Sequence, residues 1–160
     1  MSTDTSFITR SHEENWRPVL DLAVEEVFEI MLGSRVVPVA APAPEPKWEF
    51  TAMVGLAGAL CGILSICCEA ETAGKLAKAM LGETAESKDQ VSDALGEICN
   101  MVAGNFKNKL AGTDERCMLS VPTVIMGGEY SFRSMAEGNS LETVMQFEGA
   151  PVAIRLQLQS

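Results

Sequence analysis

The feature that most restricts the possible folds is an uncharged stretch over 50–68, FTAMVGLAGALCGILSICC. A run of this length could cross a membrane as a helix, and Gly58 and Gly62 form a GxxxG spacing found in membrane helices. Acidic residues flank the stretch on both sides, however, and Lys47 is the only nearby positive charge, which gives no orientation signal. We therefore interpret the stretch as two adjoining buried strands that turn between the two glycines.

The size and charge of the chain limit its domain count and its partners. Its 160 residues are 47% hydrophobic, which suffices for the core of one domain. The net charge of −10 opposes nucleic acid as a partner, because a phosphate backbone requires a basic surface. We expect a single domain over 1–160, with 1–10 as a flexible N-terminal segment. Since 1–16 lacks the apolar run of a signal peptide, we expect a cytoplasmic protein outside the membrane.

The cysteines and the histidine oppose a disulfide framework and a metal centre. The five cysteines include no CxxC pair and lie in apolar runs, so we interpret them as reduced core residues. His12 is the only histidine, so neither a zinc-type ligand set nor a histidine-based triad is expected. The chain also lacks the glycine-rich motifs of nucleotide sites.

Periodicity and turn residues predict an α+β order of elements. Apolar residues at steps of three and four predict three helices, each followed by a glycine, over 11–32, 71–81 and 87–110. Strands are expected over 35–40, 47–56, 59–68, 117–126, 141–147 and 151–158, the last two forming a hairpin. Pro122 within the fourth of these implies a bulge, a bend or an edge position. The proline-rich segment 41–46 is expected to be an extended connection.

The helix expected over 87–110 has two contrasting faces. At 100° per residue, one narrow stripe contains the polar or small residues Asp93, Glu97, Asn100, Gly104 and Lys107. The opposite stripe contains only apolar residues, which are Val91, Leu95, Ile98, Val102 and Phe106. The apolar stripe is expected to pack into the core, and the polar stripe to face outward.

Two residues of the polar stripe are unusual for an ordinary solvated helix face, although spacing alone favours that simpler interpretation. Asn100 is a mediocre helix former. Gly104 costs about 1 kcal/mol relative to alanine in mid-helix, which suggests that something approaches the backbone there. Glu97 and Asn100 lie one turn apart and can act on one incoming group. The carboxylate can hold a cation, while the carboxamide can both donate to and accept from a water molecule.

These residues resemble the signature of a known family. The pattern Asp93-x-x-x-Glu97-x-x-Asn100, followed by Pro122, is similar to that of the CheX family of chemotaxis phosphatases, within the CheC/CheX/FliY group. Further similar segments are the glycine-studded hairpin before it, the helix start at 71–73, the segment EICNMVAGN and the strand LSVPT. The resemblance runs over about 51–159, which is most of the chain.

The resemblance implies a fold, an activity and a division of roles. The implied fold is a CheC-like α+β domain, in which two long helices pack on one face of an antiparallel or mixed sheet and two copies pair through the sheet edge. The implied activity is hydrolysis of the aspartyl phosphate on a CheY-like receiver domain. By this resemblance Asn100 orients the attacking water and Glu97 docks on a receiver lysine.

The resemblance also suggests roles for the remaining residues of the polar stripe and a source for the metal ion. We assign Asp93, Gly104 and Lys107 to partner binding, because they share the face of the helix that carries Asn100. The receiver is expected to supply Mg²⁺, so we expect neither a metal site nor a cofactor in this chain.

A partial copy of the motif occurs in the first predicted helix. Asp21 and Glu25 have the same spacing, but Phe28 occupies the place of the asparagine. We therefore predict a single active site, which favours CheX over CheC. Two other function classes stay open. One is a non-catalytic binding or scaffold module for a receiver or a motor-switch protein. The other is a small-molecule-binding domain with a pocket under the glycine-rich hairpin, for which no convergent polar set is visible.

Overall fold

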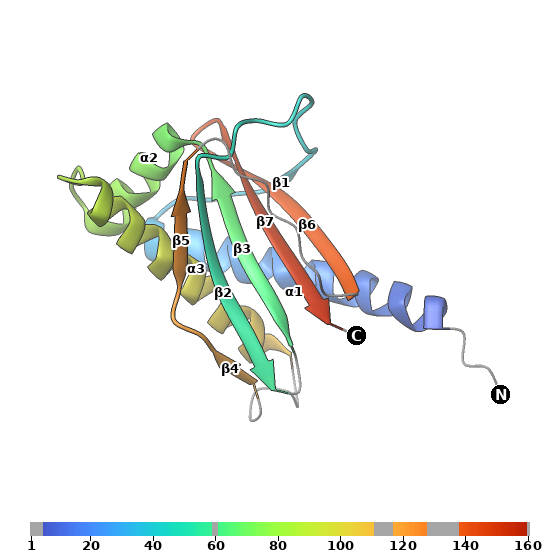
Figure 1. Ribbon diagram of the computed structural model, residues 1–160. Helices are drawn as coiled ribbons and strands as arrows, with labels where there is room; N and C mark the ends of the chain where they lie inside the picture. Colours follow the sequence, from blue (N-terminus) through green and yellow to red (C-terminus); the bar gives the residue numbers. More distant parts are fainter. Residues whose placement is uncertain (1–4, 59–60, 111–116, 128–137, 160) are drawn as a thin grey trace.

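In the part of the chain that the structure describes, the strands form one sheet and the helices lie on one face of it (Figure 1). The computed structural model describes residues 5–58, 61–110, 117–127 and 138–159, and side-chain environments for 16–58, 61–110, 117–127 and 140–158. Within these ranges the sheet has seven strands, and every strand pairing in it is antiparallel. The predicted α+β class is confirmed, and the alternative of a mixed sheet is resolved in favour of an antiparallel one.

The predicted helices are present with shifted ends. The helices are α1 (Thr5–Leu32), α2 (Ala70–Leu81) and α3 (Lys88–Lys109). Helix α1 ends because Gly33 adopts a left-handed conformation with φ of 64°, which lets the Ser34 N–H donate to the Phe28 carbonyl oxygen at 3.0 Å. Helix α3 begins after Ser87, whose hydroxyl accepts a hydrogen bond from the Gln90 N–H at 3.2 Å.

The strands follow the predicted order with two corrections. The strands are β1 (Pro38–Val39), β2 (Phe50–Gly58), β3 (Gly62–Cys68), β4 (Cys117–Leu119), β5 (Thr123–Met126), β6 (Gly138–Phe147) and β7 (Ala150–Gln159). The strand expected over 35–40 is only two residues long. The strand expected over 117–126 is broken at 120–122, and both of its parts pair with β2 at the edge of the sheet. Pro122 therefore lies in a break along an edge, as its missing N–H requires.

The uncharged stretch forms the predicted strand pair, and both strands lie inside the sheet with a strand on either side. Strands β2 and β3 pair from Phe50↔Cys68 to Leu56↔Gly62, within the order β1-β6-β7-β3-β2-β4. A side chain at Gly62 would overlap the carbonyl oxygen of Gln157 on β7, so the glycine permits close strand packing. No helix in the described part of the chain is long and apolar enough to cross a membrane.

The core lies between the sheet and the helices. Four residues of the predicted apolar stripe of α3, namely Leu95, Ile98, Val102 and Phe106, are at most 1% exposed, whereas Val91 in its first turn is only partly buried. From α1, Phe28 is fully buried, and its ring meets that of Phe147 edge-on at 5.8 Å. Burying these side chains fixes both helices on the sheet.

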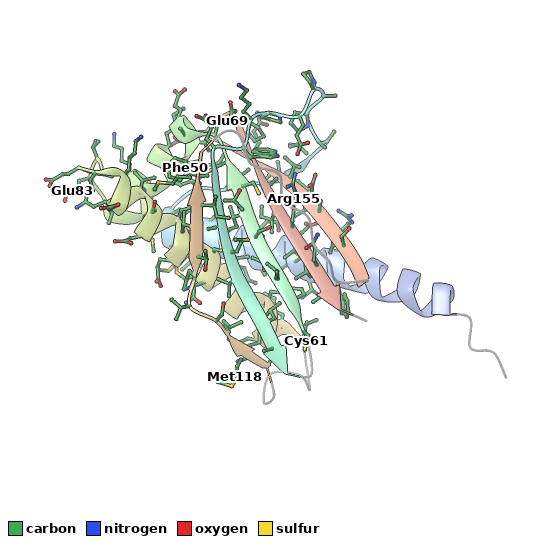
Figure 2. The ribbon with its side chains drawn as sticks, in the orientation of Figure 1. Phe50, Cys61, Glu69, Glu83, Met118 and Arg155 are labelled. Carbon is green, nitrogen blue, oxygen red and sulfur yellow. The ribbon has the colours of Figure 1, made fainter. Side chains whose placement is uncertain are left out.

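Sulfur-containing residues divide between the core and the surface. Four of the five cysteines are buried and all are reduced. Burial raises the pKa of the Cys68 thiol to about 12, so it stays protonated. Cys61 is the exception to the predicted burial, because it lies at the β2–β3 turn and donates to the Gly58 carbonyl oxygen. Met118 is 75% exposed, and Figure 2 shows it with Cys61 at one end of the sheet.

Candidate active site

The five candidate residues lie along one side of α3. Asp93 and Glu97 are exposed, whereas Asn100, Gly104 and Lys107 are partly buried. The helix is continuous from Lys88 to Lys109, so its period brings all five residues onto one face. This face is opposite the buried stripe that anchors α3, which gives the polar side chains a rigid base. Their roles in catalysis or binding stay predictions.

A groove runs between this face of α3 and the edge of the sheet. Its volume is about 440 Å³, and it is lined by Ser92, Asp93, Gly96, Glu97, Val121, Pro122 and Val124. The α3 wall carries two carboxylates, while the sheet wall is apolar. The groove therefore offers a partner both negative charge and apolar surface side by side.

The groove forms because the chain between β4 and β5 approaches α3 closely at Gly96. A Cβ atom on Gly96 would lie 3.3 Å from Cβ of Pro122 and 3.4 Å from Cγ2 of Val124, which is tighter than most Cβ contacts. The Ser92 hydroxyl also donates to Sδ of Met126 at 3.2 Å. The glycine therefore determines how near the apolar wall comes to Glu97.

Hydrogen bonds to β2 hold the apolar wall in place. The Ser120 N–H donates to the Gly55 carbonyl oxygen at 2.9 Å, and the Gly55 N–H donates to Oγ of Ser120 at 2.8 Å. The Ser120 hydroxyl in turn donates to the Val121 carbonyl oxygen at 3.1 Å. The break between β4 and β5 is thus pinned to the sheet, so the wall has a defined position.

Gly104 has a more open environment than the sequence suggested. A Cβ atom there would have Leu119 Cδ1 as its nearest side-chain neighbour at 3.8 Å, an ordinary van der Waals contact. Nothing in the described part of this chain comes close enough to require glycine. The predicted close approach to this backbone would have to come from a partner.

The C-terminal end of α3 is tied to α1 through Glu26. Lys109 Nζ lies 2.8 Å from Glu26 Oε2, and Asn105 Nδ2 donates to Glu26 Oε2 and to the Ala23 carbonyl oxygen. The hydrogen bond from Lys109, followed by that from Asn105, lowers the pKa of Glu26 below its ordinary value. These contacts limit rotation of α3, and so help to fix the direction in which Asn100 points.

Sequence reasoning missed the apolar wall, although Pro122 belonged to the recognised signature. Val121 is 85% exposed, and neither its residue type nor its spacing marks it as a site residue. The available signal was its place directly before Pro122 in a strand that a proline must interrupt.

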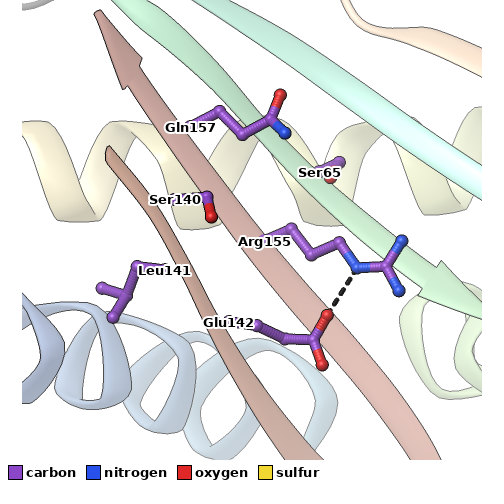
Figure 3. A pocket seen from close by; sticks show the side chains of 6 residues that line it. All are labelled: Ser65, Ser140, Leu141, Glu142, Arg155 and Gln157. Atoms are coloured by element: carbon purple, nitrogen blue, oxygen red, sulfur yellow. Dashed lines mark hydrogen bonds and ion pairs between the residues drawn. The ribbon is translucent and has the colours of Figure 1, made fainter. Parts of the chain in front are cut away.

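The ligating side chains needed for a metal are not gathered anywhere in the described residues. Within them, no group of three or more histidine, cysteine, aspartate or glutamate side chains could hold a metal ion. A second cavity of about 230 Å³ lies on the sheet (Figure 3), lined by Ser65, Ser140, Leu141, Glu142, Arg155 and Gln157.

The charges beside this second cavity pair with each other. Arg155 Nε donates to Glu142 Oε2 and its Nη2 to Glu45 Oε1, both at 2.6 Å, and its guanidinium lies 6.0 Å from the ring centroid of Trp48. Arg155 thus fastens the proline-rich segment 41–46 to the sheet, which is a structural role.

Comparison with known proteins agrees with this fold. A CheC-like superfamily protein from Shewanella sp. PV-4 has a TM-score of 0.76 at 22% identity, covering 91% of this chain and 97% of that one. The CheX–CheY–BeF3–Mg²⁺ complex from Borrelia burgdorferi matches with a TM-score of 0.75 at 24% identity, covering 90% of this chain and 97% of that one. The class defined by these likenesses is the CheC-like α+β fold.

A family model narrows this class. The model described as chemotaxis phosphatase CheX matches residues 50–146, so the chain belongs to the CheX family. The CheY-P phosphatase CheX of Thermotoga maritima is 31% identical over 84 residues, which are 51% of this chain and 54% of that protein. The match thus spans about half the length of this curated relative.

Proposed function

We propose that the chain is a phosphatase that hydrolyses the aspartyl phosphate of a CheY-like receiver domain. The observation that carries the proposal is the pair Glu97 and Asn100, one turn apart on the open face of a helix whose other face is locked in the core. Membership of the CheX family and the name of the Thermotoga relative support the same substrate class.

Asn100 is the proposed catalytic residue. Its carboxamide oxygen accepts a hydrogen bond from a water molecule. This holds the water in line for attack on phosphorus, opposite the bond to the aspartyl oxygen that breaks. No general base is needed, because the contribution is one of positioning. The rigid seat of α3 matters here, since a displacement of about 1 Å can cost about 10²-fold in rate.

Glu97 is the proposed docking residue. Its exposed carboxylate pairs with the receiver's lysine, which sets the register that brings Asn100 to the phosphoryl group. Asp93 and Lys107 extend this contact along the helix, and Gly104 leaves room for the partner's backbone. In this proposal the receiver supplies the Mg²⁺ ion, and the presence of Mg²⁺ and BeF3 in a solved CheX–CheY complex supports it.

The test is phosphate release from a phosphorylated, Mg²⁺-loaded CheY-type receiver with catalytic amounts of the chain. Wild type is expected to accelerate release, and Asn100→Ala to lose about 10²-fold in kcat, the scale for a mispositioned reactant. Glu97→Ala should mainly raise KM. Asn108→Ala is the matched control, because it removes the same carboxamide from an exposed position two turns further on.

The scaffold alternative gives a different result in the same assay. A scaffold would bind the phosphorylated receiver and leave its lifetime unchanged. Loss of activity in Asn108→Ala as severe as in Asn100→Ala would show that the variants damage the helix and would remove Asn100 from the catalytic role.

We also propose that two copies pair through a sheet edge. Among the described strands, β1 pairs only with Val144 and Met145 of β6, so the earlier part of β6 has no described strand beside it on that side. An unpaired edge favours association with another strand. Light scattering after gel filtration should give twice the mass of the chain, and a monomer at micromolar concentration would contradict the proposal.

A further inference from the structure

Val121 is an exposed apolar residue at a position where the fold gives it no packing role. It is 85% exposed, the highest value among the exposed large hydrophobic residues of the described chain. It lies in the break between β4 and β5 and lines the groove beside α3. Together with Pro122 and Val124 it forms an apolar wall beside two carboxylates, and an exposed apolar patch rimmed by polar residues is typical of a contact surface for a partner.

The backbone of Val121 is held firmly while its side chain projects outward. Ser120 bonds to Gly55 on one side and to the Val121 carbonyl oxygen on the other, and Pro122 packs against Gly96. Valine itself is branched at Cβ and has few rotamers. A side chain that is already ordered loses little entropy on binding, which favours affinity.

The lining of the groove also restricts which side chains a partner can place there. Asp93 and Glu97 form the wall opposite Val121 and Pro122, so a basic side chain held by Glu97 brings its neighbours against the apolar wall. A charged or polar neighbour there would lose water without gaining a partner. An apolar neighbour would instead gain contact with Val121.

We propose that Val121 determines specificity for the receiver, by contacting an apolar side chain that lies beside the basic side chain docked on Glu97. This inference rests on the proposed function and adds a requirement on the partner. Receivers that present a basic residue next to an apolar one bind well, whereas receivers with a polar or acidic residue at that place bind poorly. Val121 acts in docking and does not touch the reacting atoms.

The test measures binding separately from hydrolysis. Val121→Asp and wild type are titrated with a CheY-type receiver loaded with beryllofluoride and Mg²⁺, and their KM and kcat are measured with the phosphorylated receiver. Val121→Asp is expected to raise both Kd and KM by about 10-fold or more, which is the scale for loss of a buried apolar anchor. Val121→Thr keeps the shape of the side chain but replaces a methyl group with a hydroxyl. It should raise Kd by about 3-fold to 10-fold.

Met118→Asp is the matched control. Met118 is 75% exposed on the same edge of the sheet, but it pairs with Ala57, one residue away from the core-facing Leu56, and so faces away from the helices. Both variants exchange an exposed apolar side chain for a carboxylate and change the net charge equally. Met118→Asp should bind the receiver as wild type does.

The outcomes separate this inference from the proposed activity. If wild type binds the loaded receiver without accelerating phosphate release, the phosphatase proposal fails, and weakened binding by Val121→Asp alone still supports the docking role. Wild-type affinity in Val121→Asp overturns the docking role even if phosphatase activity is present. Equal weakening by Val121→Asp and Met118→Asp also overturns it, because the effect would then be one of net charge.

Discussion

Helices α1 and α3 pack against each other on the same face of the sheet and contain the same Asp-x-x-x-Glu spacing. Three positions beyond the glutamate, α3 has Asn100, which is partly exposed, whereas α1 has Phe28, which is fully buried. A polar residue next to the α1 motif has a structural role, because Glu26 bonds to Asn105 and Lys109 of α3.

The difference teaches that the direction of a helix face decides its function more than the spacing does. A motif with one step of four residues and one step of three puts its three side chains on one face of any helix. In α3 that face borders the groove at the edge of the sheet, where a partner can reach it. In α1 the third position is turned into the core, where an amide would be buried among apolar side chains. One helix can therefore carry chemistry while the other holds it in place.

The largest effect is expected when α1 is given the third residue of the α3 motif. Phe28→Asn removes a fully buried ring that packs on Phe147 and places an amide in the core. Losing such a ring costs about 3–5 kcal/mol, and an unpaired buried amide adds to this. Denaturant titration should show a free energy of unfolding lowered by at least about 3 kcal/mol, without any gain in phosphate release.

Phe28→Leu is the control, since it keeps an apolar side chain at the site and should be tolerated far better. The comparison between the helices would break if Phe28→Asn kept the wild-type midpoint and raised the rate of phosphate release. That result would mean that α1 contains a second site that only lacks its asparagine.

Most of this fold follows from local signals in the sequence. Periods of two and of 3.6, together with the stop at Gly82 after α2, predicted α2, α3 and the two hairpins to within a few residues. The break at 120–122 was not predicted as a division into two strands. It depends on the contact of Pro122 with Gly96 and on pairing of Ser120 with Gly55, which join residues far apart in the chain.

The candidate site was predictable in one half only. The stripe through Asp93, Glu97 and Asn100 can be read from the sequence because the period of a helix is constant. The apolar wall at Val121 cannot, because its exposure depends on how the edge of the sheet meets α3. A sequence pattern describes one element at a time, whereas a groove is made by two.

A smaller effect is expected from alanine at the two glycines of α3. Gly104→Ala should raise the free energy of unfolding by about 0.5–1 kcal/mol, since alanine favours helix and the nearest contact is Leu119 at 3.8 Å. Gly96→Ala should show less gain or a loss, because its Cβ would lie 3.3 Å from Pro122. Denaturation midpoints of both variants test this, and equal shifts would contradict the assigned contacts.

The Gly104 variant also tests the partner-binding prediction. A partner that approaches the backbone at Gly104 would collide with the added methyl group, so receiver binding should weaken although the protein is more stable. Unchanged Kd for the beryllofluoride-loaded receiver would remove Gly104 from the partner-binding surface and leave that surface to Asp93, Glu97 and the groove.

The smallest effect concerns the pair by which α1 holds α3, and it should depend on pH. The hydrogen bonds from Lys109 and Asn105 lower the pKa of Glu26 below 4.5 in the folded state. A lowered carboxyl pKa contributes stability that is present above the unfolded value and is lost as the pH falls through the folded value. The stability difference between wild type and Glu26→Gln should therefore be constant near neutral pH and shrink below pH 4.5.

This stability difference should also shrink in high salt, because the ion pair between Glu26 and Lys109 is partly exposed and is screened. Glu29→Gln, on the same helix and exposed, controls for the loss of one negative charge. A difference that persists unchanged at low pH would mean that α3 is held by packing against α1, with Glu26 making no contribution through its charge.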